Sequence, residues 1–148
     1  MTGRILGLDP GERRIGIAIS DATGTIASPV EFIDVRTKNH EQRIKDLCVE
    51  WEITEVVVGL PISLDGTEGP AAARSRDFGE MVGGLTDLPV SYHDERFTTV
   101  TAEQALLEGG VKRRSRTSRR DQVAAAVMLQ GFLDQRRYRH GNDNNPGT

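Results

Sequence analysis

The sequence has little of what stabilises small secreted domains or builds zinc sites. Its single cysteine, Cys48, cannot form an internal disulfide, which agrees with a reducing compartment. The histidines His40, His93 and His140 are scattered, without the spacing of zinc ligands. No apolar run approaches the length of a membrane span, and the N-terminus lacks the charged-then-apolar pattern of a secretory signal. We therefore expect a cytoplasmic protein with no membrane partner.

Chain length and charge distribution limit how the chain can be organised. Its 148 residues suffice for one domain with a full core, and we predict a single domain over residues 1–138 with a disordered tail over 139–148. Residues 1–111 carry 10 Lys and Arg against 19 Asp and Glu, whereas residues 112–140 carry 9 against 2. A concentrated basic segment favours a polyanionic partner, although a solvated, mobile loop has the same composition.

Hydrophobic periodicity predicts strands followed by alternating helices and strands. Residues 4–20 are predicted to form a β-hairpin. Gly83-Gly84 is expected to end one helix. The basic run 112–120 is expected to form a flexible loop. Further strands are predicted near residues 30–35, 56–58 and 89–94, and helices near 38–51, 71–82, 99–110 and 118–137. This order indicates an α/β fold with a five-stranded mixed sheet. An antiparallel three-strand meander would come first and parallel strands later, flanked by helices.

The first hairpin carries an acidic residue at the point where its first strand gives way to a turn. Asp9 follows the aliphatic run Ile5-Leu6-Gly7-Leu8 and precedes Pro10-Gly11, a strong turn signal in which Gly11 is expected to adopt a positive φ. A carboxylate at the end of a central strand is costly unless a partner such as a metal ion neutralises it. Asp is also a common turn residue, so Asp9 alone supports both interpretations.

Two further acids occupy comparable places. Glu95 follows the last predicted strand, and Asp121 opens the last predicted helix. Three carboxylates gathered at one sheet end would repel unless cations neutralised them, which is the chemistry of a magnesium site. Asp94 is adjacent to Glu95 and faces the other way on a strand, so spacing alone allows either as the ligand. Asp121 also fits a capping box that begins at Ser118.

Four segments of the chain resemble the YqgF/RuvX family, the Holliday-junction resolvase-like proteins also described as pre-16S rRNA nucleases, within the RNase H-like superfamily. The resemblance extends over about residues 4–134. The first segment alone is shared with actin-like ATPases, but four in order at suitable spacing are specific. They are Gly7–Ala18, Val58–Pro61 with Asp65-Gly66, Asp94–Thr99 with Ala102, and Asp121–Gln130.

The resemblance implies a catalytic site in which Asp9, Glu95 and Asp121 bind Mg²⁺ or Mn²⁺. It also selects Glu95 over Asp94 as the second acid. The true resolvases resembling RuvC have a further acid one turn after the helix acid, where this chain has Ala124. Residues expected to contact nucleic acid, beside the sheet end or in the basic segment, are Arg13, Gly59, Pro61, Arg96, Thr98, Thr99, Lys112, Arg113 and Arg114.

The leading functional hypothesis is a metal-dependent nuclease acting on structured nucleic acid, with the 16S rRNA precursor favoured as substrate by resemblance. A Holliday-junction resolvase acting on branched DNA is the alternative, and its paired cuts would call for a homodimer. A second class is a non-catalytic nucleic-acid or transcription-complex binding protein that keeps the fold. An actin-like ATPase is disfavoured, because those proteins bind nucleotide between two such domains and this chain has room for one.

Overall fold

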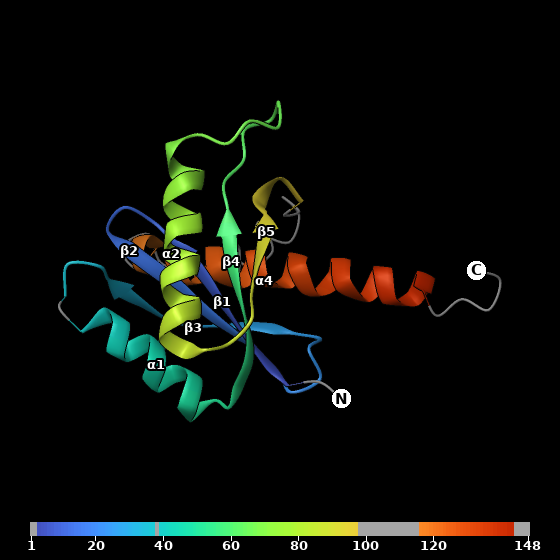
Figure 1. Cartoon of the computed structure of the whole chain (residues 1–148). Coiled ribbons are helices and arrows are strands. Elements are labelled where there is room, and N and C mark those ends of the chain that lie inside the picture. Colours follow the sequence, from blue (N-terminus) through green and yellow to red (C-terminus); the bar gives the residue numbers. More distant parts are fainter. Residues whose placement is uncertain (1–2, 38, 98–115, 144–148) are drawn as a thin grey trace.

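The computed structural model describes residues 3–37, 39–97 and 116–143, in which one twisted sheet lies between two layers of helices (Figure 1). The sheet order is β3-β2-β1-β4-β5, so β1 and β4 are central and β3 and β5 form the edges. The strands are β1 (Arg4–Pro10), β2 (Arg14–Ser20), β3 (Ala27–Asp34), β4 (Ile53–Leu60) and β5 (Val90–Asp94). The predicted five-stranded mixed sheet is confirmed.

Strand direction places three strand ends at one edge of the sheet. β1 pairs antiparallel with β2, and β2 with β3, which gives the expected meander. β4 runs parallel to β1, and β5 runs parallel to β4, with Leu8 beside Val58 and Gly59 beside His93. The carboxyl ends of β1, β4 and β5 therefore meet, and residues far apart in the chain become neighbours there.

The helices divide between the two faces of the sheet. α1 (His40–Glu50) and α2 (Pro70–Thr86) cover one face, and α4 (Arg116–Asp143) crosses the other, as Figure 1 shows. A short 3₁₀ turn, η1 (Glu95–Phe97), follows β5 directly. No helix in the described ranges is both long enough and apolar enough to cross a membrane.

Two predicted helix boundaries were wrong. α2 continues through Gly83-Gly84 to Thr86 and is capped by Asp87, which has a left-handed backbone (φ 59°) and donates its N–H to the Gly83 carbonyl at 2.9 Å. α4 begins at Arg116 and reaches Asp143, so part of the basic run predicted as a loop is helical. Arginine is a good helix former, and residues 116–120 contain no Gly or Pro. The predicted helix near 99–110 lies outside the described residues.

The turn between β1 and β2 also differs from expectation. Positive φ occurs among the described glycines only at Gly24 and Gly66, so the prediction for Gly11 was wrong. Gly11 instead donates its N–H to the carbonyl of Arg14 at 2.8 Å, and a Cβ atom on Gly11 would lie 2.9 Å from the same oxygen. The residue is small because the backbone closes on itself at this point, not because of a left-handed conformation.

Each face of the sheet carries its own core. Under α1 and α2, large aliphatic side chains from the strands meet those of the helices, among them Leu6, Leu8, Ile15, Ile17, Ile44, Leu47 and Val82. Under α4 the buried set is smaller and includes Ile5, Ala18, Val57, Ala125, Ala126, Met128, Leu129 and Leu133. A Cβ atom on Gly7 would lie 2.9 Å from Cβ of Leu129, so α4 approaches β1 at backbone distance.

Candidate active site

Asp9 lies on the α4 side of the sheet, near the end of β1. Side chains alternate along a strand, so Asp9 shares a face with Ile5, which is in the core under α4, and with Gly7, which is against Leu129. It lies opposite Gly16 of β2 in the sheet and is half-buried. The position predicted from the sequence as a strand end is thus part of a row that points toward α4.

Glu95 reaches the same place from the other side of β4. It is the first residue of η1, and its carboxylate lies over Gly59 in β4. The position that a Cβ atom would occupy on Gly59 is 2.7 Å from Oε1 of Glu95, 3.3 Å from Oδ1 of Asp9 and 3.3 Å from Cγ of Met128. Two carboxylate oxygens, contributed by β1 and by the end of β5, therefore converge on one point above the backbone of β4.

The space above Gly59 suits a hard cation. Carboxylate oxygens are the ligands that Mg²⁺ and Mn²⁺ prefer, and two carboxylates this close repel each other when no cation is bound. A Cβ atom on residue 59 would enter the space that the two oxygens border. Within the described side chains no group of three His, Cys, Asp or Glu gathers as a metal site, so Asp9 and Glu95 form a pair that needs further ligands.

Asp121 lies in α4, seven residues before Met128, the residue that contacts the Gly59 position. Seven residues make about two helical turns, so helix geometry puts both on the same side of α4. The side chain of Asp121 lies outside the described part of the structure, and its role as a third ligand stays a prediction.

Asp94 has a different partner. Arg96 donates from its side chain to Asp94 at 2.6 Å, and its backbone N–H donates to the same carboxylate at 2.9 Å. The guanidinium holds the pKa of Asp94 below its usual value. Since Glu95 and not Asp94 lies against Asp9, the geometry favours the member of the pair that the family resemblance selected.

The residues predicted to contact substrate are placed unequally. Arg13 is exposed in the β1–β2 turn, and Gly59 lies beneath the two carboxylates. Pro61 lines a pocket on the α2 side, while Arg96 is engaged with Asp94. The other five candidates lie outside the described residues: Thr98, Thr99, Lys112, Arg113 and Arg114.

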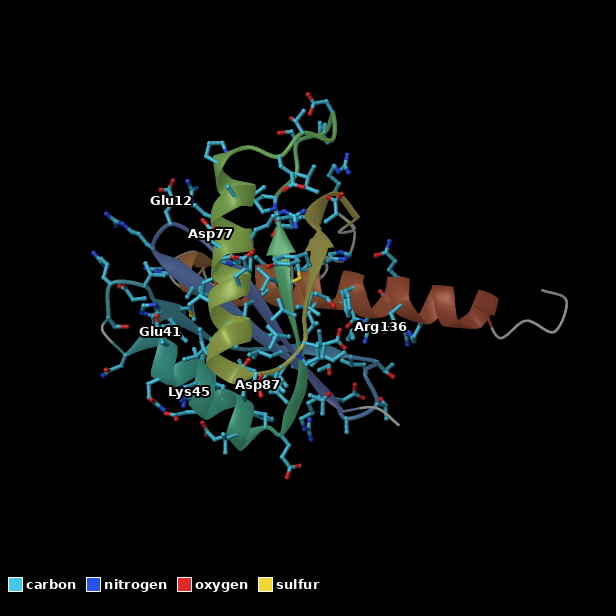
Figure 2. All side chains as sticks on the ribbon, viewed as in Figure 1. Glu12, Glu41, Lys45, Asp77, Asp87 and Arg136 are labelled. Carbon is cyan, nitrogen blue, oxygen red and sulfur yellow. The ribbon has the colours of Figure 1, made fainter. Side chains whose placement is uncertain are left out.

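One charged residue beside this edge was not predicted from the sequence. Arg74, in the second turn of α2, lines the same pocket as Pro61, with Glu12 and Phe78. Figure 2 shows Glu12 at the β1–β2 turn, beside the upper part of α2. Arg74 occupies one exposed position in a helix with several charges, and only the packing of α2 against β4 and β5 indicates which of them faces the strand ends.

Comparison with solved structures defines the class of fold. The RuvC protein of T. thermophilus in complex with a Holliday junction substrate aligns with a TM-score of 0.58 at 12% identity, covering 90% of this chain and 96% of that one. The fowlpox virus Holliday junction resolvase aligns with a TM-score of 0.54 at 13% identity, covering 89% and 99%. This chain therefore has the RNase H-like fold of these resolvases.

Sequence comparison defines the family. The RuvX family, described as Holliday junction resolvase, matches residues 3–135, and the chain belongs to this family. A protein of Halothermothrix orenii is 43% identical over 93% of this chain and 99% of its own length, and one of Streptomyces coelicolor is 47% identical over 91% and 82%. Both carry the name "Putative pre-16S rRNA nuclease".

Proposed function

We propose that this protein is a metal-dependent nuclease that hydrolyses phosphodiester bonds in the 16S rRNA precursor during ribosome biogenesis. The observation that carries the proposal is the convergence of Asp9 and Glu95 on one point above the backbone of Gly59. Membership of the RuvX family and the names of relatives above 40% identity support the reaction class and the substrate.

Asp9, Glu95 and Asp121 would hold one or two Mg²⁺ or Mn²⁺ ions. Bound there, the ions would supply a nucleophile from water at neutral pH and offset the charge that develops on the leaving oxygen. The chain's own contribution is geometric. Paired strands hold Asp9, η1 brings Glu95 to it, and the absence of a side chain at Gly59 leaves room for the two carboxylates above β4.

Basic residues would hold the substrate by its phosphates. Arg13 is exposed in the turn that follows Asp9, and it makes no ion pair within the described part of the chain. We assign the same role to Arg96, Thr98, Thr99 and the segment Lys112–Arg114. Binding should therefore weaken steeply as salt is added.

A cleavage assay with three substrates tests the proposal. Fragments of the 16S precursor, a four-way DNA junction and unstructured single strands would be incubated with Mg²⁺, with Mn²⁺ or with a chelator. We expect metal-dependent cleavage of the precursor, and its loss in Asp9→Asn. Asp77→Asn, an exposed carboxylate on α2 (Figure 2), is the matched control and should cleave normally. Equal cleavage by Asp9→Asn and wild type would refute the site.

Holliday-junction resolution is the second candidate, because the matching family is described by that activity. Paired cuts across a symmetric junction require two active sites, so this activity predicts a homodimer. Light scattering in the presence and absence of junction DNA, alongside the cleavage assay, separates the two candidates. A monomer that cuts precursor RNA and leaves the junction intact supports the rRNA nuclease. We place either activity in the cytoplasm, with nucleic acid as the partner.

A further inference from the structure

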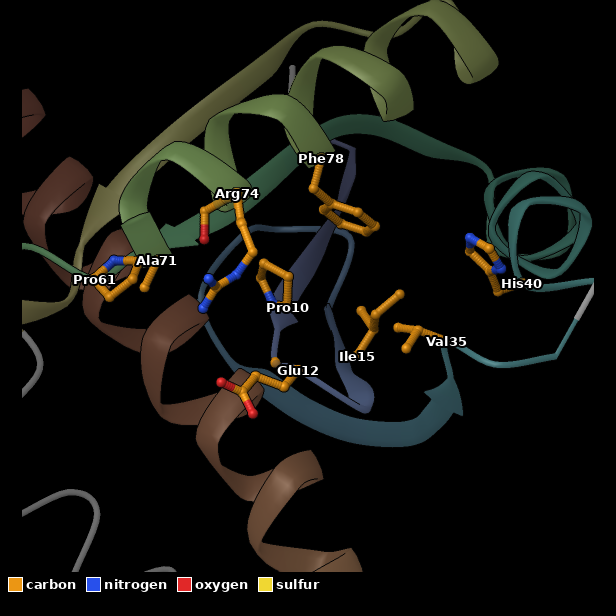
Figure 3. Close-up of a pocket in the computed structure, with 11 residues that line it drawn as sticks. Pro10, Glu12, Ile15, Val35, His40, Pro61, Ala71, Arg74 and Phe78 are labelled. Carbon is orange, nitrogen blue, oxygen red and sulfur yellow. The ribbon is translucent and has the colours of Figure 1, made fainter. Parts of the chain in front are cut away.

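A pocket of about 350 Å³ lies on the other side of the strand ends from the two carboxylates. We call it the strand-end pocket; the residues that line it include Pro10, Glu12, Ile15, Pro61, Arg74 and Phe78. In Figure 3, Arg74 and Glu12 lie beside Pro10 at one end, and Phe78 and Ile15 lie toward the other. One end is thus charged, and the other presents the apolar side chains, with His40 beyond them. The volume is within the range of sites for small organic groups.

The strand-end pocket is adjacent in the chain to the carboxylate site. Pro10 follows Asp9 directly, and Pro61 comes two residues after Gly59. Consecutive residues are 3.8 Å apart at Cα, so β1 and β4 pass from one site to the other within one or two residues. A polymer whose phosphate lies over Gly59 would have its neighbouring unit within reach of the pocket.

Arg74 differs from most described arginines in its surroundings. Arg36, Arg43, Arg76, Arg96 and Arg136 each bind a carboxylate at between 2.6 and 2.8 Å. Arg74 makes no ion pair with any residue in the described ranges, although Glu12 lines the same pocket. An exposed guanidinium with no carboxylate bound is a ready partner for a phosphate, which it can contact through two N–H groups.

The apolar end offers a surface for a flat ring. Phe78 is half-buried against the core under α1 and α2, and Ile15 is fully buried beneath the pocket. Nucleobases stack on aromatic side chains with little regard to sequence, and each such contact strengthens binding about tenfold or more. Glu12, at the charged end, could accept a hydrogen bond from a base amino group.

We propose that the strand-end pocket binds an unpaired base of the substrate next to the scissile phosphate, with Phe78 stacked on the base and Arg74 bound to its phosphate. The inference rests on the proposed function and adds a substrate class to it. A base enters such a pocket only when it has left its helix, so the protein selects single-stranded segments that flank structure.

Binding measurements in a chelator, where no cleavage occurs, test the pocket. A labelled single-stranded oligonucleotide would be titrated with wild type, Arg74→Ala, Phe78→Leu and Lys45→Ala, and compared with a fully paired duplex. Lys45 is an exposed cation on α1, far from Glu12 in Figure 2, and serves as the charge-matched control. We expect Arg74→Ala to weaken single-strand binding about tenfold and to reduce the slope of log K against log salt by about 0.7. Lys45→Ala should change neither by more than about twofold.

A second series moves one abasic position along the oligonucleotide. In wild type, one position should lose about tenfold in affinity when its base is removed, because the stacked base is lost. In Phe78→Leu the same position should lose much less, since the ring that the base contacts is already absent. Circular dichroism confirms that each variant is folded at the temperature of the titration.

The outcomes separate the pocket from the nuclease. If no position is sensitive, if Phe78→Leu leaves the penalty unchanged, or if Arg74→Ala resembles Lys45→Ala, the pocket does not bind a base. Cleavage of the precursor by wild type would then still support the nuclease. A sensitive position in a protein that never cleaves would support the pocket and refute the enzymatic function. An equal loss for duplex and single strand in Arg74→Ala would make Arg74 a general phosphate contact and overturn the proposal.

Discussion

The face of the sheet under α4 and the face under α1 and α2 are filled with different side chains. Leucines, isoleucines and valines fill the second face from both strands and helices. The first face combines Ala18, Ala125 and Ala126 with Gly7, so α4 lies close to β1. At the strand ends the difference continues, with Asp9 and Glu95 on the α4 side and the strand-end pocket on the other.

This difference indicates how the molecule positions a polar site beside a core. Close approach of a helix to a sheet requires small residues, and it brings the helix backbone near the strand ends where the carboxylates lie. The face with large side chains is covered by α1 and α2, and a pocket remains at its rim. Substitutions on the α4 side should therefore affect activity at the strand end and stability at the middle of the sheet.

The largest effect on cleavage is expected at the neighbouring acids Asp94 and Glu95, which have different partners. Glu95→Gln should lower the cleavage rate about a thousandfold, because metal-assisted stabilisation of the transition state is worth several kcal/mol. Asp94→Asn should lower it less than tenfold, because Asp94 binds Arg96 and not the site above Gly59. Single-turnover rates of both purified variants provide the measurement. A larger loss in Asp94→Asn would reverse the assignment of the second acid.

Gly59→Ala should come next. The new Cβ would lie 2.7 Å from Oε1 of Glu95, the flexible end of a side chain, so Glu95 moves and the fold remains. We expect about a hundredfold loss of cleavage, the effect of displacing a catalytic group by about 1 Å. The melting temperature should change little. A stable variant with full activity would show that the space above Gly59 is not used.

Gly7→Ala tests the same face away from the acids. Its Cβ would lie 2.9 Å from Cβ of Leu129, and neither backbone can yield easily, so we expect a loss of about 1–3 kcal/mol in the free energy of unfolding. Gly84→Ala in α2 is the matched control, because no atom lies within 4 Å of its added Cβ. It should stabilise the protein by about 0.5–1 kcal/mol. Urea denaturation measures both, and equal effects would contradict the close approach of α4.

The smallest effect concerns the ion pair that joins α4 to β4 at the other end of the sheet. Arg136 donates to Glu55 at 2.8 and 2.6 Å, and this contact lowers the pKa of Glu55 from its ordinary value of 4.5. The pair therefore contributes stability above pH 4.5, and the contribution is lost as the pH falls through the lowered pKa. Arg136 is 38% exposed, so Glu55→Gln should cost about 1 kcal/mol or less at pH 7.

Urea unfolding between pH 3 and pH 7 measures this contribution. Glu55→Gln should show a flatter dependence of stability on pH below 4.5 than wild type. Asp134→Asn is a control on the same helix, because Asp134 pairs with Arg137 within α4 and does not join the helix to the sheet. If Asp134→Asn flattened the curve as much as Glu55→Gln, the effect would come from the charge of α4 and not from its attachment.

The sequence predicted those features that depend on local pattern. Alternating isoleucines in residues 15–19 and the β-branched run 56–58 predicted strands correctly, and the element order predicted the mixed sheet. Asp9 and Glu95 were recognised because each follows an apolar strand, and family resemblance chose Glu95 over Asp94. Whether Asp121 completes the site remains a prediction, since its side chain lies outside the described part of the chain.

Other features depend on contacts that no local pattern reveals. Gly59 was predicted to contact substrate, but its position beneath both carboxylates follows from the register of β4 between β1 and β5. Arg96 was assigned to substrate without a sign that Asp94, two residues earlier, binds it. Gly83-Gly84 was predicted to end α2, but the helix continues to Thr86 and is capped by Asp87 in the left-handed conformation.

The place of β5 at the margin of the sheet has a consequence for heating. β5 has five residues and one strand neighbour, β4, while β1 has two. Edge segments open before the centre of a sheet, with a smaller free energy than global unfolding. Opening of β5 would carry Glu95 away from Asp9 while the remaining four strands stay paired. Catalytic competence should therefore fade over a temperature range in which the circular dichroism of the protein is still that of the folded state.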